Sequence, residues 1–301
     1  MDKKQKYEKI LSTPKISELI PTYDAKTILK KLYGKNILCF VKTITKEMSH
    51  CDLTFLYKNL SSIKISNSNF IFNIISPRFK TLASYSVVRN KIFIKNENSI
   101  YHELFHLASS YYSREKETIF TGFKQTNGNN SIGTGINEGY TELLSERYFK
   151  DEKDNLSYPF NVIIVKSLEN IIGKEKMEQL YMKADLYNLI QELKKYNNHE
   201  KSVIDFIKNV DFICDNVDIS KWLSKKQRKL SIYKINSVLT FLINSFTFKA
   251  YNISANERLD TLKNNIMSLV KDGEEYSLEK YPSLKTALIQ LNELEMVKRK
   301  V

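Results

Sequence analysis

The pattern of apolar and polar positions changes partway along the chain. Three early segments are rich in Ile, Val, Phe and Thr and alternate locally between apolar and polar residues, namely residues 36–45, 62–75 and 84–95. Alternation of this kind places every second side chain on one face of a strand. We therefore predict that these segments form a small mixed sheet. A helix is predicted before them at residues 24–33, where Asp24 can cap the first turn and Gly34 can end the helix.

From residue 99 onward the hydrophobic period is mainly helical, and a loop rich in Gly and Asn at residues 122–135 interrupts it. Gly173 and the pair Asp272–Gly273 are the expected helix stops in the later part. The predicted fold class is α+β, with a small N-terminal mixed sheet and an HExxH active-site helix, followed by a mainly α-helical C-terminal lobe. The change of period predicts lobes at residues 1–155 and 156–301, the second closing a cleft.

Charge alone would suit nucleic acid or an anionic membrane, because the net charge is +13. The densest basic run, residues 221–234, is spaced by apolar residues as in an amphipathic helix, so a solvated helix face is the favoured interpretation. No zinc ribbon, helix-turn-helix or platform of aromatic and basic residues is recognisable in the sequence. We therefore expect no specific nucleic-acid partner.

Cysteine usage and hydropathy bear on the environment of the protein. Cys39, Cys51 and Cys214 form no CxxC pair and cannot all pair with one another, which favours a reducing compartment. Residues 1–20 contain no apolar stretch of signal-peptide length, and the apolar tract at 235–248 is too short and too interrupted to span a bilayer. We expect a cytoplasmic protein without a membrane span. Leaderless export and the oligomeric state stay open.

The strongest chemical signal is the HExxH string His102-Glu103-Leu104-Phe105-His106. On a helix, positions i and i+4 share one face, so both imidazoles can bind one zinc ion at about 2.0 to 2.1 Å. Glu103 would then lie beside the metal, where its carboxylate can take a proton from a metal-bound water. A purely structural zinc site usually recruits cysteine, and none lies nearby in the sequence.

Zinc that keeps one position for water needs a third protein ligand. Glu138 and Glu142 are four residues apart in a second amphipathic segment, so both can point at the metal helix. We assign Glu138 as the third ligand and Glu142 as the acceptor for the outer N–H of a ligating histidine. The alternative is an ordinary helix face with two solvated carboxylates.

The string His102 to His106, followed by Asn137-Glu138-Gly139-Tyr140-Thr141-Glu142, resembles the gluzincin pattern of thermolysin-like zinc metallopeptidases. The resemblance implies that Glu138 is the third ligand and that Glu142 orients a zinc histidine. It covers about residues 84–150, and the spacing between His106 and Glu138 is longer than in thermolysin itself. Clostridial neurotoxin light chains also combine HExxH with a distant glutamate, so a toxin-like protease with a narrow protein target is a second subfamily.

These observations predict a zinc metallopeptidase in which Glu103 activates a zinc-bound water for the hydrolysis of peptide bonds. In the families that the sequence resembles, the strand before the metal helix is an edge strand, so the resemblance implies that a peptide or protein substrate adds to residues 84–95. The residue that stabilises the oxyanion stays open among Tyr158, Tyr181, Tyr187 and His199. From other classes, a catalytically inactive zinc-binding interaction protein and a nucleic-acid binder are the alternatives, and the presence of Glu103 favours the enzyme.

Overall fold

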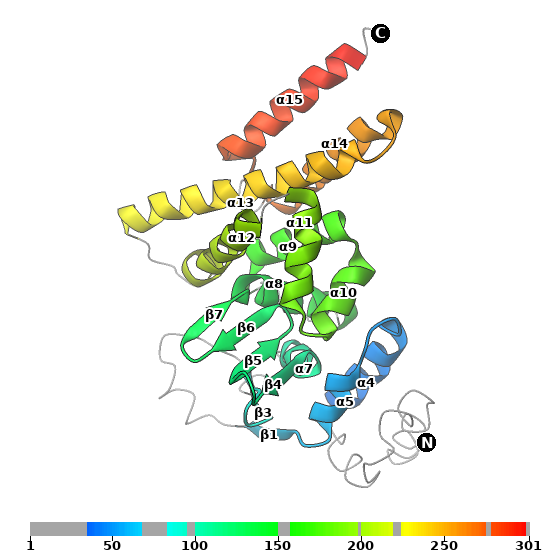
Figure 1. Cartoon of the computed structure of the whole chain (residues 1–301), viewed down its shortest axis with the longest axis vertical. Coiled ribbons are helices and arrows are strands. Elements are labelled where there is room, and N and C mark those ends of the chain that lie inside the picture. Colours follow the sequence, from blue (N-terminus) through cyan, green and yellow to red (C-terminus); the bar gives the residue numbers. More distant parts are fainter. Residues whose placement is uncertain are drawn as a thin grey trace. The chain divides into compact units, whose positions relative to one another are not determined.

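The computed structural model describes residues 35–67, 83–94, 100–149, 157–197, 200–218, 224–274 and 278–298 (Figure 1). Within these residues the protein is mixed α+β, largely helical with two small sheets. This confirms the predicted class in its coarse form. The helix expected at residues 24–33 lies outside the described residues.

The chain forms two compact units. The first comprises Met1–Ser131, Leu144–Asn155 and Glu178–Asp185, and the second comprises Ile132–Leu143, Leu156–Met177 and Leu186–Val301. The lobes expected at residues 1–155 and 156–301 stay a prediction.

The first elements in the described part of the first unit are helices α4 (Lys35–Glu47) and α5 (Thr54–Leu60). The strand expected at residues 36–45 is therefore wrong. Ile37, Phe40, Val41 and Ile44 are each at most 1% exposed and recur at the helical spacing i, i+3, i+4, i+7. Burial of this face in the core outweighs the strand preference of its β-branched residues.

A three-stranded sheet follows, formed by β1 (Lys64–Asn67), β2 (Ala83–Ser86) and β3 (Lys91–Ile94) in the order β1-β3-β2. Strand β3 pairs in parallel with β1 and antiparallel with β2. The segment at residues 84–95, expected as one edge strand, is thus a hairpin whose second strand lies in the middle of this sheet. Its turn places Asn90 at φ 43°, a conformation that asparagine tolerates better than most residues.

The second sheet has the order β4-β5-β6-β7, with β4 (Ser110–Ser113), β5 (Thr118–Thr121), β6 (Lys124–Asn127) and β7 (Asn130–Ile132). It corrects the expectation of a loop at residues 122–135. Gly122 at φ 51° and Gly128 at φ 56° make the turns, and glycine adopts this region without a steric penalty. The polar sequence of β6, Lys-Gln-Thr-Asn, gave no strand signal.

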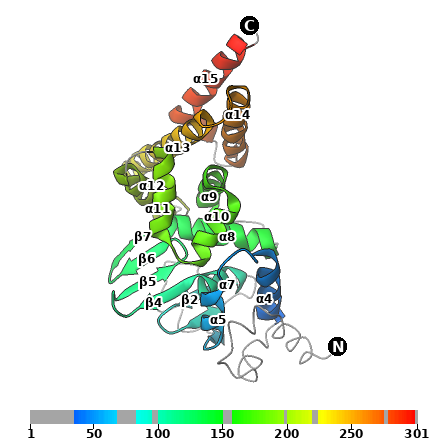
Figure 2. The same cartoon turned by 45° about the vertical axis from the view of Figure 1, so that its right-hand side comes forward.

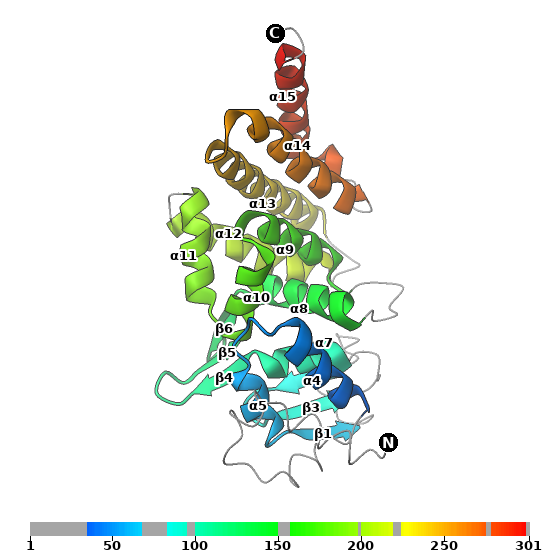
Figure 3. The ribbon, with the colours of Figure 1, turned by 90° about the vertical axis from the view of Figure 1, so that its right-hand side faces the viewer.

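Helix α7 (Ile100–Ala108) lies between the two sheets in sequence and packs on α4, α5 and β2 (Figure 3). The other helices are α8 (Thr134–Phe149), α9 (Pro159–Ile172), α10 (Lys174–Met182), α11 (Leu186–Asn197), α12 (Glu200–Ile213), the π-helical turn η2 (Cys214–Asp218), α13 (Lys225–Tyr251), α14 (Ala255–Asp272), the 3-10 turn η4 (Leu278–Lys280) and α15 (Pro282–Lys298).

The predicted stops hold, because Gly173 caps the C-terminus of α9 and Gly273 caps that of α14. In the second unit, α13 packs against α9, α11, α12, α14 and α15 (Figure 2).

The structure also bears on the expectations about membrane spans and cysteines. Among the described residues, no helix combines the length and apolar character needed to cross a membrane. Cys39, Cys51 and Cys214 are free thiols, and the latter two are buried. The cellular compartment stays a prediction.

Candidate metal centre

Helix α7 is buried around nearly its whole circumference, with every residue except Tyr101 enclosed. Leu104, Phe105 and Leu107 are each 0% exposed. The ring of Phe105 lies edge-on to that of Phe40, with centroids 5.0 Å apart. This apolar packing holds the helix in place, so the positions of its polar side chains are well defined.

His102 and His106 lie side by side on α7, and they are 7% and 9% exposed. Their Nε2 atoms are 3.1 Å apart, and their rings stand at 77° with centroids separated by 4.8 Å. Two nitrogens on one tetrahedral zinc ion, each about 2.0 to 2.1 Å from the metal, would lie about 3.3 Å apart. The pair therefore has the separation that a shared metal ion requires.

Glu138, which is half-buried in the first turns of α8, supplies a third donor. One ring nitrogen from each histidine and one Glu138 carboxylate oxygen all lie within 4.8 Å of one another. Imidazole nitrogens suit zinc, whereas magnesium prefers a shell of oxygen atoms. The three predicted ligands thus fit zinc in donor type, and the two histidines also fit it in spacing. Glu103, at 6% exposed, is enclosed on the same helix as the histidines but is not one of this group.

The first turn of α8 is held by a residue far away in the sequence. The Asp211 carboxylate on α12 accepts hydrogen bonds from the backbone N–H of Gly133 at 2.9 Å and of Gly135 at 2.8 Å. Free N–H groups at a helix N-terminus attract a carboxylate both as donors and through the helix dipole. Sequence reasoning missed Asp211, since nothing in its local sequence indicates this contact.

Two glycines allow Asn161 of α9 to approach α8 closely. A Cβ atom on Gly135 would meet the Val210 carbonyl oxygen at 2.5 Å, and one on Gly139 would meet the Asn161 carbonyl carbon and oxygen at 2.6 Å. The Asn161 amide also donates to the Gly135 carbonyl at 2.7 Å. Together with Asp211, this contact fixes the helical turn that carries Glu138.

Glu142, the expected acceptor for a histidine N–H, is 4% exposed. Its Oε1 atom accepts the backbone N–H of Ser157 at 2.8 Å, a contact that the sequence did not indicate. Its role toward a ligating histidine stays a prediction.

The four residues considered as oxyanion donors occupy unlike environments. Tyr181 is fully buried, with its ring centroid 5.5 Å from that of Phe123, and Tyr187 is 69% exposed. Tyr158 precedes the first turn of α9, while His199 lies outside the described residues.

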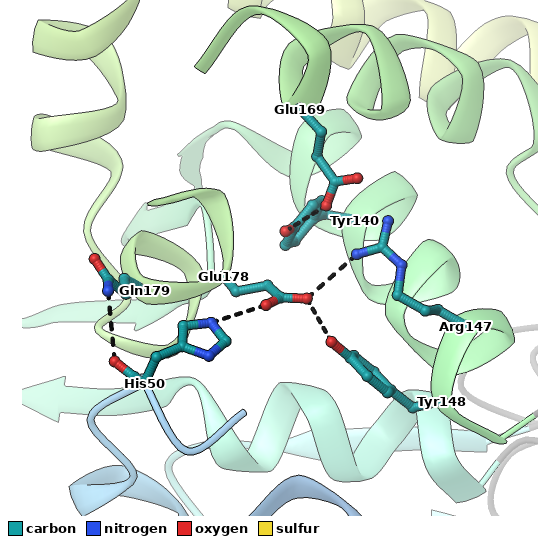
Figure 4. Close-up of polar contacts among 7 residues, drawn as sticks. All are labelled: His50, Tyr140, Arg147, Tyr148, Glu169, Glu178 and Gln179. Atoms are coloured by element: carbon teal, nitrogen blue, oxygen red, sulfur yellow. Dashed lines mark hydrogen bonds and ion pairs between the residues drawn. The ribbon is translucent and has the colours of Figure 1, made fainter. Parts of the chain in front are cut away.

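A second polar cluster, which the sequence did not indicate, surrounds Glu178 (Figure 4). This carboxylate is 0% exposed, and its Oε2 atom lies 2.9 Å from His50 Nε2. Its Oε1 atom accepts the Tyr148 hydroxyl at 2.6 Å and Arg147 Nη1 at 3.3 Å. Burial and the hydrogen bond to Glu178 hold the pKa of Tyr148 well above its usual range. These contacts compensate the cost of burying the Glu178 carboxylate.

One similar protein is named RNA helicase NPH-II, from Melanoplus sanguinipes entomopoxvirus. The two sequences are 26% identical over 252 residues, which cover 77% of this chain and 31% of the relative. The chain therefore spans about a third of the relative's length. No family model matches the chain, and no solved structure matches it.

This likeness contradicts the interpretation of the chain as a gluzincin-type zinc metallopeptidase or a toxin-like protease, because the similar protein bears the name of an RNA helicase. It also contradicts the expected peptide or protein substrate and the expectation of no specific nucleic-acid partner. The physical reason for the error is that HExxH specifies two metal donors and a carboxylate, not a reaction. The net charge of +13, whose densest run at residues 221–234 was interpreted as a solvated helix face, suits a polyanion.

Proposed function

We propose that this chain is an RNA-binding module that holds a zinc ion. The observation that carries the proposal is the likeness to a protein named RNA helicase over 77% of the chain. The sequence contains no GxxxxGK[ST] string, the loop that cradles nucleotide phosphates in many motor proteins. The proposal for this chain is therefore RNA binding and not ATP hydrolysis.

Electrostatics support an RNA partner. The chain has 47 Lys and Arg residues against 34 Asp and Glu residues. Binding of such a chain to a polyanion releases condensed counterions, which gives affinity without any base-specific contact.

Zinc is the second part of the proposal, with His102, His106 and Glu138 as its ligands. The support is the donor set, with two buried imidazoles whose Nε2 atoms are 3.1 Å apart and a carboxylate oxygen within 4.8 Å of them. When bound, the ion would join residues that are distant in the sequence and so stabilise the folded state.

Fluorescence anisotropy with the full chain tests the RNA-binding proposal. A labelled single-stranded RNA of mixed sequence is titrated with zinc-loaded protein at several salt concentrations. We expect a dissociation constant in the micromolar range or below at physiological salt, weakening steeply as salt rises. Absence of binding down to low salt would refute the proposal.

A further inference from the structure

We propose that the N-terminal turns of α13 form the surface that contacts single-stranded RNA, an inference that rests on the RNA-binding function proposed above. The surface consists of Lys226, Lys229, Leu230 and Tyr233, and we call it the α13 stripe.

The composition of α13 is the first observation behind this inference. The helix (Figure 1, yellow) contains six Lys and Arg residues and no Asp or Glu in 27 residues. Most of this positive charge lies near the N-terminus, the end at which the helix dipole disfavours cations. A capping box formed by Ser224 and Gln227 already satisfies this end of the helix. The charge therefore does not serve helix stability.

The geometry of the stripe is the second observation. Its members are spaced i, i+3, i+4 and i+7, so they share one face of α13. The opposite face carries Ser231, Ile235 and Leu242, which are 5%, 4% and 0% exposed. On the stripe itself, both lysines are exposed, Leu230 is 41% exposed and Tyr233 is 67% exposed. Two ammonium groups and an aromatic ring thus face solvent together.

This combination matches the chemistry of single-stranded RNA. Ammonium groups pair with backbone phosphates, and an exposed aromatic ring can stack on an unpaired base of any identity. A duplex offers the same phosphates but keeps its bases stacked on one another, so Tyr233 would add little to duplex binding. The stripe therefore predicts preference for single strands without strong sequence preference.

An anionic membrane would also attract the lysines, but it fits the stripe less well. A helix that lies in a membrane interface buries a broad apolar face among the acyl chains. The broad apolar face of α13 is already enclosed within the second unit, where Val238 and Leu242 are each 0% exposed. Leu230 alone supplies the apolar part of the stripe.

The lysines are tested with the double variant K226Q/K229Q. Glutamine has nearly the helix propensity of lysine, so the fold should be retained, which circular dichroism and thermal melting check. If both lysines contact phosphates, the slope of log affinity against log salt should fall by about 1.4 on single-stranded RNA. The matched control K58Q/K116Q removes the same charge from two exposed lysines of the first unit and should leave the slope near wild type. Equal effects of the two pairs would overturn the inference.

Tyr233 is tested on the same RNA and on a duplex. Y233A should weaken single-strand binding roughly 5- to 100-fold, with a much smaller effect on the duplex, while Y233F should bind like wild type because it keeps the ring. Tyr187, which is 69% exposed on α11, gives the control Y187A, whose affinity should not change.

The outcomes separate this inference from the function on which it rests. Wild-type protein that binds RNA while Y233A and K226Q/K229Q behave like their controls would reject the stripe and leave the RNA-binding function standing. Wild-type protein that binds no RNA would reject both. Tighter binding to phosphatidylserine vesicles than to RNA, lost in K226Q/K229Q, would assign the stripe to a membrane.

Discussion

At the residue scale, the main feature is a pair of buried histidines on α7. Imidazoles that are 7% and 9% exposed, as in His102 and His106, lose most of their hydration and need partners for their polar atoms. The Nε2 atoms of the two histidines lie 3.1 Å apart, close to the separation of two nitrogen ligands on one cation. The short sequence separation within α7 made this pair visible in the sequence.

Single substitutions should distinguish the proposed zinc ligands from the neighbouring Glu103 by their effect on zinc content. We expect one zinc ion per chain, with H102A, H106A and E138A each losing most of it, because a tetrahedral site with two protein ligands binds weakly. E103Q is the matched control, since Glu103 is equally buried on α7 but outside the ligand group, and it should retain zinc. Elemental analysis of dialysed protein measures all four variants. Full zinc content in E138A would show that the third ligand is misassigned.

Glu178 should matter more for stability than an ion pair on the surface. E178A removes a fully buried carboxylate that is the partner of the half-buried His50, Arg147 and Tyr148, which we expect to cost about 3 kcal/mol. Glu192, which pairs with the exposed Lys195 at 2.6 Å, provides the control E192A, expected to cost about 1 kcal/mol or less. Urea unfolding measures both free energies. Similar decreases in the free energy of unfolding in the two variants would show that the Glu178 cluster contributes no more than a surface ion pair.

At the element scale, the close approach of α8 and α9 determines the position of Glu138. Gly135 and Gly139 are one turn apart on α8, and the space beside them is filled by Asn161 and Val210. The Asp211 carboxylate fixes the same turn through two backbone N–H groups. The position of this candidate ligand therefore depends on α9 and α12 as much as on its own helix.

G139A tests this contact through the sign of its effect. An alanine in an open helix interior would stabilise by about 1 kcal/mol relative to glycine. Because a Cβ atom here would lie 2.6 Å from the Asn161 carbonyl group, we instead expect destabilisation by about 1 to 3 kcal/mol. Thermal and urea unfolding of the variant decide between the two signs. An increase in stability would mean that α8 and α9 are not in close contact at this point.

Local spacing explains which elements the sequence could predict. The stops at Gly173 and Gly273 follow from one residue and its neighbours, and both were found. The region of α4 was misassigned because its β-branched residues suggested a strand, although their spacing also fitted a buried helix face. Asp211 and Asn161 were missed because their partners on α8 are distant in the sequence.

At the scale of the whole molecule, the sequence did not predict the class of partner, and the reason differs from that for the missed elements. A solvated helix face and a face that contacts RNA contain the same types of residue, so the basic run at 221–234 does not indicate by itself whether it binds a partner. The pattern of His102, His106 and Glu138 indicated metal donors but carried no information about the reaction. The likeness to a protein named RNA helicase supplied the evidence that composition and spacing lacked.

We propose that the chain binds RNA and does not hydrolyse peptide bonds. The most direct test uses one zinc-loaded preparation of the full chain, divided between an anisotropy titration with single-stranded RNA and digestion of a peptide library with and without a chelator. We predict salt-dependent RNA binding and a peptide library that is unchanged in both digestions. Chelator-sensitive cleavage of peptides, lost in E103Q with zinc retained, together with no affinity for RNA, would contradict the claim.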